Sequence, residues 1–386
     1  MVTELKESCR PGFPAPFPRQ LTMAGSISLI AIFAGAVLLQ WLLRGLGTAW
    51  GLVDVPLGRK HHRVITPLTG GLAIFVAFLL AVVLHPDVDT WGLLWPLSGL
   101  TVLLACGVVD DLIHLPAGLK LIVQLLAAVL LLAPGNALLA QIEGLPLLGT
   151  VDLGILAWPI SIFFVVAVIN AFNLIDGLDG LASGVAVVAL AWLAMAVEAL
   201  QGEPAAVLPV LAIALATATS MLVFNMRHPW CERATVFLGD SGSLLLGALL
   251  AWLALRSGQG EPVGVPLVVV GWVLALPLWD SASVILRRAC RGANPMRADG
   301  THLHHVLRAA GLSVEQTVVV MLVASLLLGA VGVCGWMLGV PLAYLSLGLI
   351  VPVALHSAAI VLLTRRRAWA HQAPAGRTAI GGSHAS

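Results

Sequence analysis

The segment NAFNLIDGLDGLASG, at residues 170–184, concentrates polar chemistry in an otherwise apolar chain. Four polar side chains recur there every three residues: Asn170, Asn173, Asp176 and Asp179. Neighbours in such a series share a helical face, and the glycines between them allow a ligand or another backbone to come close. Burying these groups beside a bilayer is costly unless they have partners. The pattern therefore favours a functional site over a purely structural one.

Two adjacent carboxylates lie in the segment VVDDLIHLPAGLK at residues 108–120. Asp110 and Asp111 repel each other, and a divalent cation or a retained proton relieves that repulsion. Either arrangement suits catalysis, and Lys120 can neutralise one carboxylate or bind a phosphate. The alternative interpretation is a solvated helix cap.

Asp240 lies in FLGDSGSLLLG, directly before an apolar run. Ser241 or Ser243 can cap the helix that begins there, and the amides of its first turn, near Gly239, face an anion. Asp240 adds a hard ligand for Mg²⁺ that bridges a diphosphate. Alone, this turn is also typical of a plain helix start.

Two segments gather basic side chains. In DVPLGRKHHRVITPLTGG, at residues 54–71, Lys60 and His62 would bind either lipid headgroups or an anionic phosphate substrate. RADGTHLHHVL, at residues 297–307, contains Arg297, His302, His304 and His305. Imidazole and guanidinium groups bond phosphate oxygens, which predicts donors for a diphosphate and a sugar. A zinc site is the alternative, but no nearby cysteine or second carboxylate completes it.

The elements that hold these residues must lie in a membrane. Of 386 residues, 59% are hydrophobic and 10% charged, with a mean hydropathy of +1.00. A soluble domain carries about 25% charged residues, so a soluble protein is excluded. The chain contains many apolar runs of about 20 residues, the length that spans a bilayer. These runs must be helices, because backbone polar groups cannot stay unpaired in hydrocarbon. We predict an all-α polytopic protein with about eleven transmembrane segments, near 24–46, 68–85, 91–109, 119–134, 153–170, 181–200, 205–224, 242–257, 265–287, 317–338 and 341–363.

The distribution of Lys and Arg orients the chain. Most of these residues fall in alternate loops, which places the N-terminus outside and the C-terminus in the cytoplasm. We expect a disordered tail at 1–22, a transmembrane catalytic domain at 23–364 and a second disordered tail at 365–386. The unusual residues lie in the inner loops, which favours an enzyme facing the cytoplasm.

A cation-coupled transporter is the rival class, and it would carry ionisable residues near mid-span. The one candidate is Asp280, with Arg287 seven residues further on. A structural ion pair and a catalytic role are equally supported there.

In their order along the chain, the five segments make it resemble the polyprenyl-phosphate N-acetylhexosamine-1-phosphate transferases (glycosyltransferase family 4). The similarity in motifs covers roughly residues 50 to 312. The HLHH form at 302–305 resembles the branch that uses UDP-N-acetylglucosamine and undecaprenyl phosphate. Another UDP-N-acetylhexosamine or the UDP-MurNAc-pentapeptide precursor of peptidoglycan remains an alternative donor.

The resemblance implies roles for individual residues. Asp240 would be the principal Mg²⁺ ligand with Asn173 nearby, and Mn²⁺ is an expected substitute for Mg²⁺. Asp110 and Asp111 would supply the base or metal-site carboxylates, and Asp176 and Asp179 would shape the nucleotide and metal site. The substrate contacts would come from Lys60, His62, Lys120, Asn170, Gly239, Arg297, His302, His304 and His305.

The resemblance also implies the cellular setting. The expected partners are a UDP-N-acetylhexosamine, a polyprenyl phosphate, membrane lipid and a second copy in a homodimer, without nucleic acid. The expected location is the bacterial inner membrane, with the active site on its cytoplasmic face.

Overall fold

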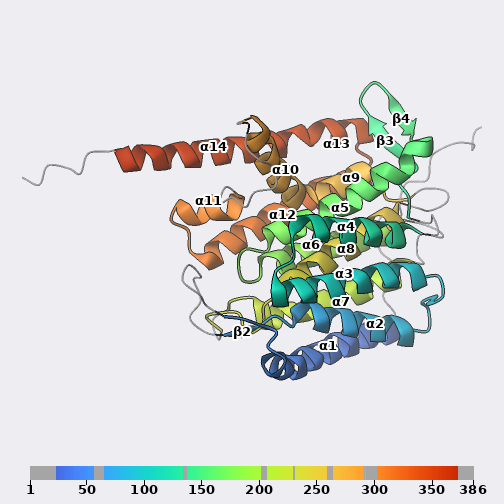
Figure 1. Ribbon diagram of the computed structural model, residues 1–386. Coiled ribbons are helices and arrows are strands. Elements are labelled where there is room, and N and C mark those ends of the chain that lie inside the picture. Colours follow the sequence, from blue (N-terminus) through green and yellow to red (C-terminus); the bar gives the residue numbers. More distant parts are fainter. Residues whose placement is uncertain are drawn as a thin grey trace, which may run out of the picture.

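The protein is a bundle of helices that run alongside one another (Figure 1). The computed structural model describes residues 23–55, 65–133, 137–200, 207–228, 231–258, 264–290, 292 and 302–372. The longer helices are α1 (Met23–Ala49), α2 (Gly70–Leu84), α3 (Leu94–Ile113), α4 (Ala117–Leu132), α5 (Ala157–Ile175), α6 (Leu181–Glu198), α7 (Leu208–Asn225), α8 (Gly239–Ser257), α10 (Ala275–Cys290), α12 (Val314–Met337) and α14 (Ile350–Gln372). Shorter helices are η1 (Gly154–Leu156), α9 (Leu267–Val273), α11 (Leu303–Ala309) and α13 (Leu342–Gly348).

The structure confirms an all-helical membrane architecture at a coarser level than predicted. Seven of the described helices are long and apolar enough to cross a membrane, or eight if α9 and α10 form one bent span. The other predicted segments fall on α2 and α4, which are apolar but shorter, and on the buried helix α8. The total of eleven spans and the orientation of the termini stay predictions.

Helix α8 forms the centre of the bundle. Every residue from Ser241 to Leu255 is buried, and the helix packs mainly against α3 and α5. Glycines allow this close packing at its first turn, because a Cβ at Gly71 of α2 or at Gly107 of α3 would overlap the backbone at Ser241 and Gly242. The first turn of α8, which carries Asp240, is thus fixed between neighbouring helices.

Two short strand pairs lie at opposite ends of the bundle (Figure 1). β1 (Val53–Asp54) pairs with β2 (Thr66–Pro67), and Phe237 donates a backbone hydrogen bond of 2.9 Å to Pro67. This strand pair therefore holds the segment that leads into α8. At the other end, β3 (Gln141–Leu145) and β4 (Gly149–Asp152) form an antiparallel hairpin that the sequence analysis did not predict.

The predicted segment 265–287 is not a single straight helix. Helices α9 and α10 meet at an angle of 80°. Pro277 explains the break, because its ring has no N–H for the carbonyl of Val273, the last residue of α9, and would clash with it. Pro352 stands in the same relation to Gly348, the last residue of α13.

The terminal segments differ in how far the structure reaches. Helix α14 continues to Gln372, eight residues past the predicted boundary at 364. The N-terminal tail at 1–22 and the last part of the C-terminal tail lie outside the described residues.

Candidate active site

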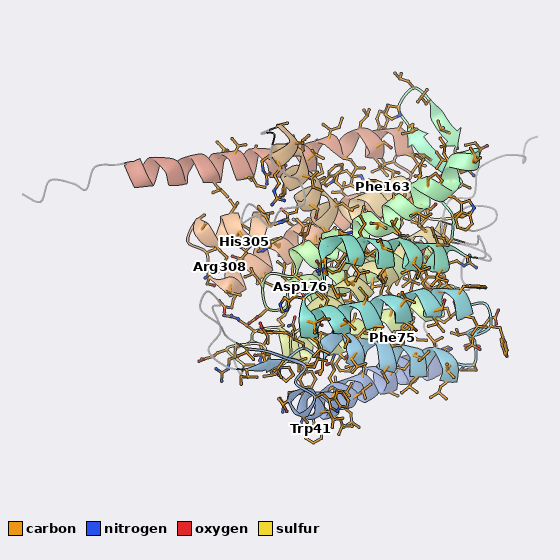
Figure 2. All side chains as sticks on the ribbon, viewed as in Figure 1. Trp41, Phe75, Phe163, Asp176, His305 and Arg308 are labelled. Carbon is orange, nitrogen blue, oxygen red and sulfur yellow. The ribbon has the colours of Figure 1, made fainter. Side chains whose placement is uncertain are left out.

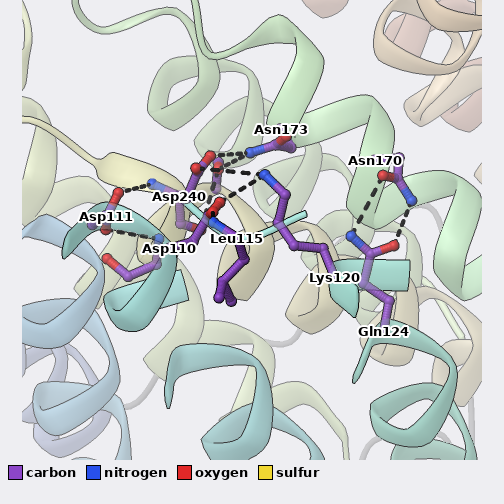
Figure 3. Close-up of polar contacts among 10 residues, drawn as sticks. Asp110, Asp111, Leu115, Lys120, Gln124, Asn170, Asn173 and Asp240 are labelled. Carbon is purple, nitrogen blue, oxygen red and sulfur yellow. Dashed lines mark hydrogen bonds and ion pairs between the residues drawn. The ribbon is translucent and has the colours of Figure 1, made fainter. Parts of the chain in front are cut away.

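Asp111 holds the beginning of α8. Its Oδ1 accepts a hydrogen bond from the backbone N–H of Asp240 at 2.8 Å, and its Oδ2 accepts one from Ser241 at 3.1 Å (Figure 3). The first N–H groups of a helix lack intrahelical partners and carry partial positive charge, so a carboxylate there is stabilising. Gly239 has a φ of 72°, and a Cβ on it would lie 2.7 Å from Asp111 Oδ2. Glycine is therefore needed at this position.

Lys120 lies between two carboxylates that come from α3 and α8. Its Nζ is 2.7 Å from Asp110 Oδ2 and 3.9 Å from Asp240 Oδ2 (Figure 3). Asp110 also accepts a hydrogen bond of 2.6 Å from the backbone N–H of Leu115. The Asp110 side chain is 3% exposed, whereas that of Asp240 is 35% exposed. Asp240 is thus the more accessible carboxylate for a ligand.

Helix α5 supplies two asparagines with different surroundings. Asn173 Nδ2 donates to Asp240 Oδ1 at 2.6 Å and to Ser243 Oγ at 3.0 Å. Asn170 instead faces α4, where its Nδ2 donates to Gln124 Oε1 at 2.7 Å (Figure 3). Of the two asparagines, only Asn173 contacts Asp240.

Asp176 follows the last residue of α5 and is half-buried. It forms no hydrogen bond with any residue that the structure describes. Burial raises the pKa of Asp176 to about 8, and the negative charges of Asp240, Asp111 and Asp179 add to that rise. Several acidic side chains thus crowd around one nearby lysine, and the Asp176 carboxyl retains its proton at neutral pH.

The donors around Asp240 suit Mg²⁺. Carboxylate and amide oxygens are the hard ligands that this ion prefers, and a cation would relieve the repulsion at Asp176. Within the described part of the chain, no three His, Cys, Asp or Glu side chains form a ready-made metal site. The fit rests on the chemistry of the donors, with Asp240 and Asn173 as the residues that would hold the ion.

Asp179 is part of an ion-pair network. Arg227 lies with its Nε 2.8 Å from Asp179 Oδ2 and its Nη1 3.0 Å from Glu315 Oε1. The backbone N–H of Ala234 donates to the same Asp179 oxygen at 3.3 Å. Asp179 thus ties the turn after α5 to the start of α12.

The three histidines lie next to one another. The ring centroids of His304 and His305 are 4.1 Å apart, and those of His302 and His304 are 5.8 Å apart. His304 packs against Gly177, where a Cβ would overlap its Nε2. Gly177 adjoins Asp176, so the histidine segment and the acidic residues border one site; Figure 2 labels Asp176 and His305.

His304 is neutral in these surroundings. Burial lowers the pKa of His304 to about 3, and the neighbouring His305 contributes to the decrease. Neither ring nitrogen has a hydrogen-bond partner among the described residues. The zinc alternative gains no support, because the described part of the chain has no group of three or more His, Cys, Asp or Glu side chains placed to hold a metal ion.

Three predicted contacts cannot be located. Lys60, His62 and Arg297 lie outside the described residues.

Some residues of the site region were not predicted. The side chain of Asn225, at the end of α7, accepts from Gly180 N at 2.9 Å and from Ser183 Oγ at 3.0 Å, and it donates to Val236 O at 3.0 Å. Its signal in the sequence was a lone amide at the end of an apolar run. Gln124, in the middle of α4, and Arg227 and Glu315, near helix ends, had no comparable signal, because isolated polar residues are common in both places.

The sequence is similar to those of known proteins. Residues 93–258 match glycosyl transferase family 4. The undecaprenyl-phosphate alpha-N-acetylglucosaminyl 1-phosphate transferase of Yersinia pestis is 30% identical over 82% of this chain and 85% of its own length. The chain belongs to glycosyl transferase family 4.

Other members of the family have similar names. The probable undecaprenyl-phosphate N-acetylglucosaminyl 1-phosphate transferase of Bacillus subtilis (strain 168) is 31% identical over 78% of this chain and 81% of its own length. The Escherichia coli (strain K12) protein with the same name as the Yersinia one is 28% identical over 80% of this chain and 83% of its own. The predicted family is confirmed, and with it the enzyme class: this member of family 4 is a phosphoglycosyl transferase.

Proposed function

We propose that the enzyme transfers N-acetylglucosamine-1-phosphate from UDP-N-acetylglucosamine to undecaprenyl phosphate and releases UMP. The observation that carries the proposal is the meeting of Asp110, Asp111 and Asp240, from α3 and α8, beside Lys120. The names of the relatives support the choice of donor and acceptor. The product would start a cell-envelope polysaccharide at the cytoplasmic face of the inner membrane.

The proposed reaction joins two anions. An oxygen of the lipid phosphate attacks the β-phosphorus of the UDP-sugar, the bond to UMP breaks, and a polyprenyl diphosphate sugar remains. Lys120 can exchange Asp240, 3.9 Å away, for a phosphate oxygen while it stays paired with Asp110. In the proposal, Asp110 or Asp111 accepts the proton of the lipid phosphate, and the histidine segment contacts the diphosphate and the sugar.

The proposal includes Mg²⁺ held by Asp240 and Asn173. When bound, this ion would neutralise charge on the diphosphate. Asp111 keeps Asp240 in place through the first amides of α8. Lys120 and Asp110 hold the other side of the site.

The first test is a donor panel on detergent-solubilised protein. Polyprenyl phosphate and Mg²⁺ are combined with separate UDP-N-acetylhexosamines and with UDP-MurNAc-pentapeptide, and UMP and lipid-linked product are followed. We expect product with UDP-N-acetylglucosamine and none in EDTA. Folded protein that gives no product with any donor would sink the proposal, and flux across sealed vesicles would then support the transporter alternative.

The second test removes single carboxylates. Asp110→Asn and Asp240→Asn should each abolish turnover and leave folded protein in the membrane. Asp152→Asn, on the exposed hairpin at the opposite end of the bundle, is the matched control and should keep full activity. Full activity in either site variant would remove that residue from the mechanism.

A further inference from the structure

One buried carboxylate holds the histidine segment. Asp280 of α10 is 1% exposed, and its Oδ2 lies 2.9 Å from His302 Nδ1. Its Oδ1 accepts a hydrogen bond of 2.8 Å from the backbone N–H of Leu303 and lies 3.2 Å from His356 Nε2. A single side chain thus joins α10, the start of α11 and α14.

An ion pair with Arg287 was one of the two interpretations of Asp280 that the sequence left open. Seven residues of helix separate the two by about 10.5 Å along the axis. Arg287 Nη1 donates instead to Ser283 Oγ at 3.1 Å. The carboxylate points away from its own helix, toward the histidine segment.

The contact with Asp280 determines which ring nitrogen of His302 carries the proton. An Nδ1 that faces a carboxylate carries a proton, and this fixes the plane of the ring and turns Nε2 to the opposite side. The bond from Leu303 fixes the residue between His302 and His304. His304 is 1% exposed and has no hydrogen-bond partner among the described residues, so nothing polar in that part of the chain holds its ring against Gly177. Its ring is placed by the backbone that Asp280 holds and by the neighbouring rings of His302, which stacks on it, and His305.

We propose that Asp280 is a positioning residue for the donor site, with His356 as its second anchor. Asp280 orients His302 and keeps His304 against Gly177, so it acts on substrate only through the histidine segment. The inference rests on the proposed function in one respect, the contact of that segment with the UDP-sugar.

The enzymatic test is a double-mutant cycle. In Asp280→Asn, the amide presents its N–H to His302 Nδ1 and favours the opposite tautomer of the ring. Replacing the aspartate of a catalytic triad by asparagine has the same effect on its histidine. We expect kcat/KM for the UDP-sugar to fall on the order of 10- to 100-fold, mainly through KM, with KM for the lipid unchanged. In a His302→Ala background, the same change should add little. Independent, multiplying losses would show a merely structural role and overturn the proposal.

Two further variants complete the cycle. His356→Ala should give a smaller loss of the same kind, and this loss should also vanish in the His302→Ala background. It serves in place of Asp280→Asn if that variant fails to fold. Leu286→Ala, at an exposed position of the same helix, is the control and should match the unsubstituted enzyme.

A measurement without substrate separates this inference from the proposed function. Hydrogen exchange of the peptide that covers 302–309 should speed up in Asp280→Ala, because the Leu303 amide loses its acceptor. Unchanged protection would overturn the proposed contact even in an active enzyme. Lost protection in an enzyme that accepts no UDP-sugar would support the contact and reject the proposed function.

Discussion

Gly177 brings the acidic residues and the histidine segment together. Gly177→Ala would force His304 aside, at a cost of about 1–3 kcal/mol for overpacking. We expect kcat/KM to fall on the order of 10- to 100-fold, because small displacements at a site are costly in rate. Gly118→Ala on α4 meets no atom within 4 Å and is the control. Steady-state kinetics of both variants measure this. A Gly177→Ala enzyme as active as Gly118→Ala would contradict the close packing of His304.

The Asp176 carboxyl should make the stability of the protein depend on pH. The pKa of Asp176 is about 8 in the folded protein against an ordinary value of 3.8, so the folded state binds more protons between these limits. Stability from this group therefore falls as pH rises from about 4 to 8. Asparagine does not titrate, so the Tm of Asp176→Asn relative to that of the unsubstituted enzyme should increase as pH rises from 5 to 8. Thermal unfolding in detergent with EDTA measures this, and a constant difference in Tm would contradict it.

Sequence reasoning found the polar residues but not their surroundings. Spacing of three residues turns a helix by about 300°, so a series of four drifts away from one face. Asn170 accordingly pairs with Gln124, while Asn173 reaches Asp240. Asp179 lies beyond the end of α5 and pairs with Arg227. Such partners come from distant parts of the chain and cannot be inferred from local spacing.

At the scale of elements, the start of α8 depends on the glycine at 107. Gly107→Ala would push the Cβ into the backbone of Ser241, and backbone cannot move aside as a flexible side chain can. We expect lost turnover and a lower Tm, because Asp111 and Asp240 would be forced apart. Gly35→Ala on α1 meets nothing within 4 Å and should be neutral. A Gly107→Ala enzyme with unchanged kinetics and Tm would refute this packing.

Hydrophobic length predicted most helices, since each predicted apolar segment falls on a described helix or a pair of helices. It did not predict the bend between α9 and α10, although Pro277 was visible in the sequence. Proline is tolerated in membrane helices, so its presence alone does not fix a break. The β3–β4 hairpin was missed because the positive φ angles of Gly144, at an irregularity in β3, and of Leu147, in the turn, follow from local geometry that hydropathy does not report.

At the scale of the whole molecule, the site and the β3–β4 hairpin should face opposite compartments. Cys290, exposed at the end of α10, marks the proposed cytoplasmic side. Leu147→Cys, at the fully exposed tip of the hairpin, marks the other side. In otherwise cysteine-free variants, an impermeant maleimide should label the hairpin position in intact spheroplasts and Cys290 only after lysis. The reverse pattern would invert the predicted topology.

The burial of α8 has a consequence for how the protein is made. This helix carries Asp240 and Arg256 and is not among the helices apolar enough to cross a membrane by themselves. An isolated copy would be poorly retained by the insertion machinery, so it needs neighbours to accept it. Its main neighbours, α3 and α5, leave the ribosome first. The order of translation thus brings Asp240 between helices that are already inserted, and a permuted gene that encodes α8 ahead of them should yield protein that is degraded.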